Sequence, residues 1–164
     1  MIRQPLTKEK ALQRLESLCS RSEQCEFDLN RKMITWGITS QDRKEIIEDL
    51  KSNRYVDEAR FARSFAHDKS KFSGWGPSKI RMELIKRKIS STVITESLQS
   101  VENKVWKDAI LRLAENKAKN LDLTGEDSWN NQQKLYRYLI GRGYPSSAVS
   151  KIVTMMRKRQ EEQA

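Results

Sequence analysis

The residues of this 164-residue chain that could do metal or redox chemistry are few and widely spaced. Cys19 and Cys25 lie six positions apart, and His67, the single histidine, is far from both. A structural zinc site needs a set of Cys and His ligands, and a disulfide framework needs several cysteine pairs. We therefore expect no metal and no disulfide, and we expect both cysteines to be ordinary core or half-buried residues.

The segment KFSGWGP, residues 71–77, is the strongest local break in the chain and a second candidate for chemistry. A glycine-rich loop that opens a helix can hold phosphate, but the Walker pattern Gly-x-x-x-x-Gly-Lys-Ser/Thr is absent from the sequence. Pro77 suits the first turn of a helix. We therefore interpret the segment as a structural turn, in which Lys71 and Trp75 are candidate contacts to a partner.

Acid–base catalysis is not indicated either. The carboxylates are scattered along positions expected to face solvent, and one histidine cannot supply an acid–base pair. In the stretch YVDEARFARSF, residues 55–65, Phe61, Ala62 and Phe65 recur at helical spacing, which favours a place in a core. We expect a protein that is not an enzyme, with no catalytic residue and no cofactor.

The composition favours thin layers of amphipathic helices over a two-sided parallel sheet, because only 37% of the residues are hydrophobic and 33% are charged. A formal charge of +10 serves either solubility alone or attraction to a polyanion, and both readings stay open. No apolar run approaches about 18 residues, and MIRQPLTKEK lacks the apolar core of a signal peptide. We expect a cytoplasmic protein with no membrane contact.

The elements that must position any site are given by an internal repeat. Three segments align without gaps, at residues 29–40, 80–91 and 135–146. Their shared apolar positions have the i, i+4, i+5 spacing of one helix face and are predicted to form its buried stripe. These positions are Leu29, Met33 and Ile34 in the first copy, Ile80, Leu84 and Ile85 in the second, and Leu135, Leu139 and Ile140 in the third.

Each copy also carries a stop signal at one position. Gly37, Lys88 and Gly143 stand where helices commonly end in a left-handed residue, so Lys88 is expected either to carry modest strain or to form a different turn. A serine three residues later, Ser40, Ser91 or Ser146, can open a second helix. A further helix is predicted before each pair, near residues 7–20, from an N-cap at Asp57 to about 69, and near 103–120. The chain is thus predicted to be all-α, with three-helix repeats at 1–54, 55–102 and 103–164.

The central motif resembles the RecX family of bacterial regulatory proteins. It reads Tyr55-Val56-Asp57-Glu58-Ala59-Arg60-Phe61-Ala62, then Gly76-Pro77, Ile80-Arg81-Met82-Glu83-Leu84 and Arg87-Lys88-Ile89. Lys88 replaces the glycine that is usual in the family, and Tyr138 to Tyr144 resembles its C-terminal element. The residues to which the resemblance assigns a structural role are Tyr55, Asp57, Arg60, Phe61, Gly76, Pro77, Leu84 and Gly143.

The resemblance implies an elongated, curved array of three tandem three-helix repeats. It also implies binding to the RecA filament on single-stranded DNA, with inhibition of its ATPase, recombinase and co-protease activities, and hence a role in recombination, DNA repair and the SOS response. A monomer without cofactor is expected, and contact with single- or double-stranded DNA stays open. The alternative is a protein that binds nucleic acid directly, with one helix-turn-helix pair in the major groove.

The candidate contact residues come from two segments that are depleted in acids. Residues 69–88 hold seven bases and one acid, and residues 128–160 hold seven bases and no acid, whereas residues 1–54 are nearly balanced. Such segments favour contact with a polyanion. The candidates, expected at the surface, are Lys69, Lys71, Trp75, Lys79, Arg81, Lys86, Arg87, Lys88, Lys134, Arg137, Arg142, Arg157, Lys158 and Arg159.

Overall fold

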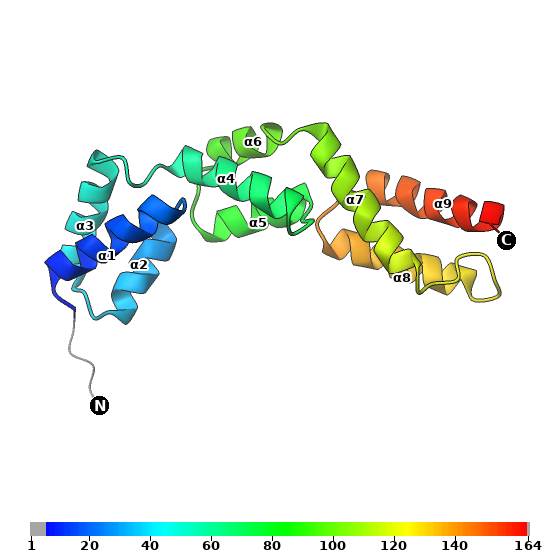
Figure 1. Ribbon diagram of the computed structural model, residues 1–164, viewed down its shortest axis with the longest axis horizontal. Helices are drawn as coiled ribbons and strands as arrows, with labels where there is room; N and C mark the ends of the chain where they lie inside the picture. The colour runs from blue at the N-terminus through cyan, green and yellow to red at the C-terminus, as the bar shows by residue number, and fades with distance from the viewer. Residues whose placement is uncertain (1–5, 164) are drawn as a thin grey trace, which may run out of the picture. The chain divides into compact units, whose positions relative to one another are not determined.

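A computed structural model of the chain describes residues 6–163, a range that contains nine helices and no strand (Figure 1). In chain order the helices are α1 (Lys8–Arg21), α2 (Glu26–Thr35), α3 (Ser40–Ser52), α4 (Glu58–Lys71), α5 (Pro77–Lys86), α6 (Ser91–Gln99), α7 (Asn103–Ala118), α8 (Ser128–Gly141) and α9 (Ser146–Gln163). Residues 1–5 and 164 lie outside the described range. The first half of MIRQPLTKEK, the segment compared with a signal peptide, is therefore not described. The all-α prediction is confirmed.

The chain divides into two compact units, which are described separately, and the unit boundaries fall within α4, α5 and α6. Unit 1 comprises residues 1–64 and 84–95, and unit 2 comprises residues 65–83 and 96–164. The core of unit 1 is formed chiefly by α1, α2 and α3, around Leu15, Leu29 and Met33. In unit 2, α7, α8 and α9 pack against one another (Figure 1), with Leu135 and Leu139 completely buried. The predicted repeat boundaries fall between helices, and the division into three repeats at those residues stays a prediction.

The three stop signals have the same backbone geometry. Gly37, Lys88 and Gly143 all have positive φ, at 75°, 60° and 95°. In each copy the N–H of this residue donates to a carbonyl three residues earlier, and the next N–H donates to a carbonyl five residues earlier. This pair of bonds is the Schellman ending of a helix. Of the two alternatives for Lys88, the structure shows the left-handed helix ending, whose strain amounts to about 1 kcal/mol.

The predicted helix starts are also confirmed. The Asp57 carboxylate accepts a hydrogen bond from the N–H of Arg60 at 2.8 Å, which is the geometry of an N-cap. Helices α3, α6 and α9 begin at Ser40, Ser91 and Ser146. The capping side chain of α3 is the preceding residue, Thr39, whose hydroxyl accepts from the N–H of Asp42 at 3.1 Å.

One part of the predicted buried stripe is wrong. Ile34, Ile85 and Ile140 are 52%, 57% and 38% exposed, although their neighbours Met33, Leu84 and Leu139 are completely buried. Successive residues of a helix point about 100° apart, so a position beside the last buried one is covered only if another helix lies over it. Each of these helices ends within two residues of its isoleucine, and the packed helices cover only the other face.

The remaining general predictions concern thiols and membranes. Cys19 is half-buried and Cys25 is buried, and both are free thiols, as predicted. Among the helices of residues 6–163, none has the length and apolar character needed to cross a bilayer. Within the same range, no group of three His, Cys, Asp or Glu side chains could hold a metal ion.

Candidate functional site

The family-like motif at the start of α4, residues 55–62, has a structural role in unit 1. The Arg60 guanidinium donates to a Glu23 carboxylate oxygen at 2.6 Å and to the Arg54 carbonyl at 3.0 Å. Phe61 is buried, and Tyr55 packs against the core of the unit. This motif therefore fixes the start of α4 and presents no reactive group.

The loop that follows α4, residues 72–76 in unit 2, is held by three side chains distant in sequence. Arg112 donates to the carbonyl of Lys71 at 3.0 Å, Arg142 donates to that of Ser73, and the Tyr144 hydroxyl donates to that of Gly74 at 3.2 Å. Burial raises the pKa of Tyr144 to about 12, so its hydroxyl keeps the proton that it donates at neutral pH. The loop is thus tied down on both sides of residue 72.

Backbone contacts complete the attachment of this loop. The Gly76 N–H donates to the Arg142 carbonyl at 2.7 Å, and the Ser78 N–H donates to the Gly143 carbonyl at 3.0 Å. A Cβ atom at Gly76 would lie 2.4 Å from the carbonyl carbon and oxygen of Gly143, and one at Gly143 would lie 2.5 Å from the nitrogen of Lys79. These two glycines let the two backbones touch, which is why larger residues do not fit here.

An aromatic and basic surface lies on this rigid loop. Trp75 has the ammonium groups of Lys69 and Lys79 at 4.9 and 4.6 Å from its ring centroid, a cation–π arrangement. Phe72 is 73% exposed, with the Lys71 ammonium 5.5 Å from its ring centroid. Sequence alone places Phe72 beside a basic segment but does not distinguish an exposed aromatic from a buried one.

Two of the candidate cations are part of the internal structure. Arg142 is half-buried and holds the loop through Ser73, so the expectation of a surface position for it is wrong. The Arg87 guanidinium, on a side chain that is only 23% exposed, pairs with Asp28 at 3.1 Å in unit 1. Both side chains bind groups far away in sequence, which charge counting cannot reveal.

Most of the other candidates fall into two sets. Arg157 and Arg159 have acidic partners in Glu161 and Glu115, at 3.5 and 2.7 Å. A second set is exposed and, among residues 6–163, pairs with no carboxylate. It consists of Lys71, Lys88, Arg81, Lys134, Arg137 and Lys158. Lys86 is also exposed. The contact role of all these residues stays a prediction.

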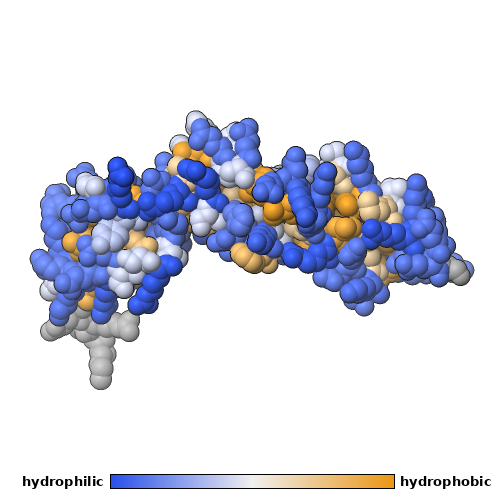
Figure 2. All heavy atoms as spheres, turned by 45° about the horizontal axis from the view of Figure 1, so that its top comes forward, coloured by the Kyte–Doolittle hydropathy of each residue, from blue (hydrophilic) through white to orange (hydrophobic). Residues whose placement is uncertain are grey.

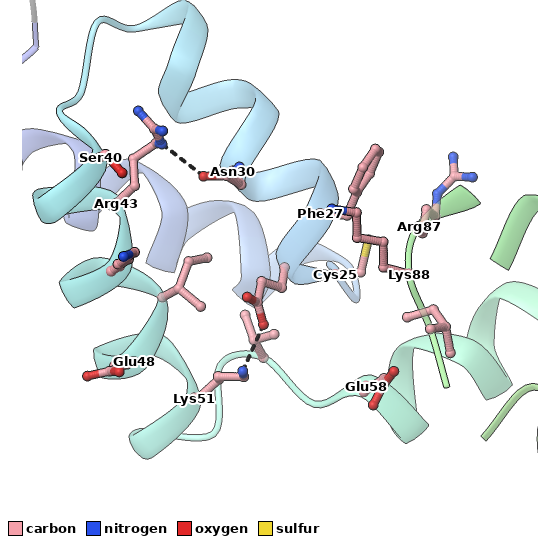
Figure 3. Close-up of a pocket in the computed structure, with 15 residues that line it drawn as sticks. Cys25, Phe27, Asn30, Ser40, Arg43, Glu48, Lys51, Glu58, Arg87 and Lys88 are labelled. Atoms are coloured by element: carbon pink, nitrogen blue, oxygen red, sulfur yellow. Dashed lines mark hydrogen bonds and ion pairs between the residues drawn. The ribbon is translucent and has the colours of Figure 1, made fainter. Parts of the chain in front are cut away.

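Unit 1 contains a cleft of about 630 Å³ beside Cys25 (Figure 3). Two of its cations are held by neighbouring side chains: Lys51 donates to Glu26 at 2.7 Å, and Arg43 donates to the Asn30 side chain at 2.9 Å. Burial raises the pKa of Cys25 to about 11, which keeps the thiol protonated and unreactive near neutral pH. The described groups of this cleft therefore offer neither a nucleophile nor an acid–base pair.

Together, the fold and the loop define a helical-repeat protein with a rigid basic and aromatic surface. The family profiles for RecX, second three-helix domain, and RecX, third three-helix domain, match residues 57–98 and 107–153. The chain belongs to the RecX family of regulatory proteins.

Individual relatives agree with this assignment. The chain is 30% identical over 146 residues to the regulatory protein RecX of Clostridium botulinum (strain Eklund 17B / Type B), covering 89% of this chain and 66% of the relative. The chain thus spans somewhat less than two thirds of that relative's length. It is 26% identical to the Haemophilus ducreyi protein of the same name, over 92% of this chain and 95% of the relative.

Solved structures show the same fold. A crystal structure of regulatory protein RecX superposes with a TM-score of 0.75 at 21% identity, covering 90% of this chain and 71% of the other. The crystal structure of RecX from Lactobacillus salivarius gives a TM-score of 0.73 at 19% identity, covering 91% and 96%.

Proposed function

We propose that this protein binds the RecA filament on single-stranded DNA and inhibits its ATPase, recombinase and co-protease activities. Membership of a family of regulatory proteins supports a regulatory role. The observation that carries the proposal further is the set of exposed cations without carboxylate partners, defined above, together with the rigid loop at Phe72. Cations that are not neutralised within the protein are available to the phosphates and carboxylates of a nucleoprotein filament.

RecA-catalysed ATP hydrolysis on single-stranded DNA is the most direct test. With the RecA of the same organism, we expect the rate to fall at well below one copy of this protein per RecA. An array of repeats that bridges neighbouring subunits would affect filament growth beyond the site it covers. If hydrolysis is unchanged at saturating protein, the proposal is wrong.

The exposed cations of unit 2 should control affinity and its salt dependence. Replacing Lys71, Lys134 and Lys158 with glutamate should weaken binding to the RecA–DNA filament and make its dependence on salt shallower, because fewer ions are exchanged on binding. Each change should alter the free energy of unfolding by no more than about 0.5 kcal/mol, since all three side chains are exposed. Fluorescence anisotropy across a salt series, with thermal melts, measures both effects.

A matched control removes the same charge from another place. Lys10, Lys32 and Lys44 are also exposed, but they lie in the nearly balanced first segment. Their replacement with glutamate should reduce affinity much less than the change in unit 2. Equal losses would mean that net charge, and no particular surface of unit 2, attracts the filament.

Direct nucleic-acid binding is the second candidate function, and the exposure of Phe72 favours it. An exposed aromatic ring beside lysines can stack on a single-stranded base. Trp75 is less suited, because two ammonium groups already lie against its ring. Binding to naked single-stranded DNA that survives moderate salt, without an effect on RecA, would favour this function over the first.

A further inference from the structure

The exposed isoleucines occupy one position of the repeat in all three copies. Ile34, Ile85 and Ile140 are separated by 51 and 55 residues, the spacing of the repeat itself. Figure 2 shows a mostly hydrophilic surface interrupted by small hydrophobic patches. Single exposed apolar residues are common on proteins and need no explanation. Here, however, every copy of the repeat has an isoleucine at the same exposed position. Such a repetition is not expected by chance and requires a cause.

Packing and helix formation do not account for the exposed part of these isoleucines, which is 38–57% of each residue. Packing on the helix face is supplied by the neighbouring residues Met33, Leu84 and Leu139, which are completely buried. A β-branched side chain also forms helix less readily than Glu, Lys, Gln or Arg, which would be the better choices at an exposed helical position. The exposed part of each isoleucine therefore contributes nothing to the stability of the fold.

An arginine accompanies each isoleucine on its helix. Arg31 and Arg137 precede their isoleucines by three residues, and Arg81 precedes Ile85 by four, so each pair shares one helix face. All three arginines are exposed, and among residues 6–163 none forms an ion pair with a carboxylate. Each repeat thus presents an apolar side chain beside an uncompensated positive charge.

On α5, the helix that carries Ile85, a second exposed apolar side chain enlarges the apolar surface. Met82 is 59% exposed and lies three residues before Ile85, on the same side of α5. A flexible thioether adapts to an irregular partner surface. The middle repeat therefore offers the broadest version of the feature that the outer repeats share.

These features identify a partner by its chemistry. Aliphatic side chains cannot stack on bases as aromatic rings do, so a nucleic acid would gain little from this position. An apolar contact bordered by arginine is typical of protein interfaces and fits an apolar site bordered by carboxylates. A feature repeated three times fits a partner whose own subunits repeat.

We propose that Ile34, Ile85 and Ile140, each with its neighbouring arginine, are three equivalent docking points for successive protein subunits of the RecA filament. This inference rests on the proposed function and assigns the protein-binding part of it to the middle helix of each repeat. In this assignment, the exposed cations of unit 2 and Phe72 contact the DNA within the filament. Removing cations should change the salt dependence of binding affinity, whereas removing the isoleucines should not, so the assignment can be tested.

The test replaces each isoleucine with glutamine, singly and together, and measures affinity for the assembled RecA–DNA filament. Burying the exposed part of an isoleucine contributes roughly a fivefold gain in affinity, so each single change should weaken binding about fivefold. For independent sites the losses multiply, so the triple variant should bind on the order of a hundredfold more weakly. The slope of affinity against salt should stay unchanged, because no charge is removed.

Two controls make the result decisive. Met155→Gln changes a side chain that is 40% exposed but lies off the repeated position, and it should bind like wild type. Thermal melts of all variants should stay close to wild type, since each replaced side chain is 38–57% exposed. If the triple variant binds as wild type does, the docking points are wrong and the proposed function stands. If wild type itself fails to bind the filament, both are wrong.

Discussion

Gly76→Ala should lower the stability of unit 2 by about 3 kcal/mol, because the added methyl group has no space. Its Cβ would lie 2.4 Å from the carbonyl carbon and oxygen of Gly143 and 2.6 Å from the nitrogen of Tyr144. These are backbone atoms of the segment that also holds the loop, so relief requires the two segments to separate. Separation breaks the hydrogen bonds to the Arg142 and Gly143 carbonyls.

The loss should extend to function. Once the loop is released, Phe72 and Lys71 are no longer held in one position. Ordering them on binding then costs free energy and lowers the affinity. We therefore expect Gly76→Ala to weaken filament binding even below its melting temperature. Hydrogen exchange should show faster exchange at residues 72–78, which locates the damage.

Gly141→Ala is the matched control for this substitution. A Cβ atom at Gly141 meets nothing within 4 Å, and the residue ends helix α8. Alanine forms helix more readily than glycine, so this variant should be as stable as wild type or slightly more stable. Calorimetry of both variants compares them directly. Equal melting of Gly76→Ala and wild type would show that the two backbones do not make this contact.

Leu84→Asp should unfold the middle of the chain. Leu84 is completely buried, and its carbonyl accepts the N–H of Ile89 at 3.1 Å in the turn that Lys88 already strains. An unpaired carboxylate there costs several kcal/mol, or its pKa rises until the group is neutral. Since a domain of this size is stable by about 5–15 kcal/mol, the change removes a large share of that stability.

The neighbouring residue provides the control. Ile85→Asp introduces the same carboxylate one position further, on a side chain that is 57% exposed. We expect that variant to melt close to wild type, because the charge stays in water. Far-ultraviolet circular dichroism during heating distinguishes the two variants. A cooperative melt at the wild-type temperature for Leu84→Asp would mean that the repeat alignment is wrong.

The sequence by itself determined the helices, their order and the form of their endings. Gly37 and Gly143 adopt the left-handed conformation that the alignment predicted, and Lys88, for which the sequence left a different turn open, adopts it as well. Asp57 caps α4 as predicted. These features depend on residues at most about five positions apart, so the spacing of apolar, capping and stop residues is enough to specify them.

Only the tertiary structure decided which of these residues face solvent. The bonds from Arg142 to Ser73 and from Tyr144 to Gly74 join residues 69 and 70 positions apart. Arg142, a predicted contact residue, thus has an internal role, and the loop that it helps to fix leaves Phe72 exposed to solvent. Ile34, Ile85 and Ile140 belong to the apolar pattern of their helices, yet they stay 38–57% exposed. Periodicity gives the direction of a side chain around its own helix, but exposure depends on what packs there.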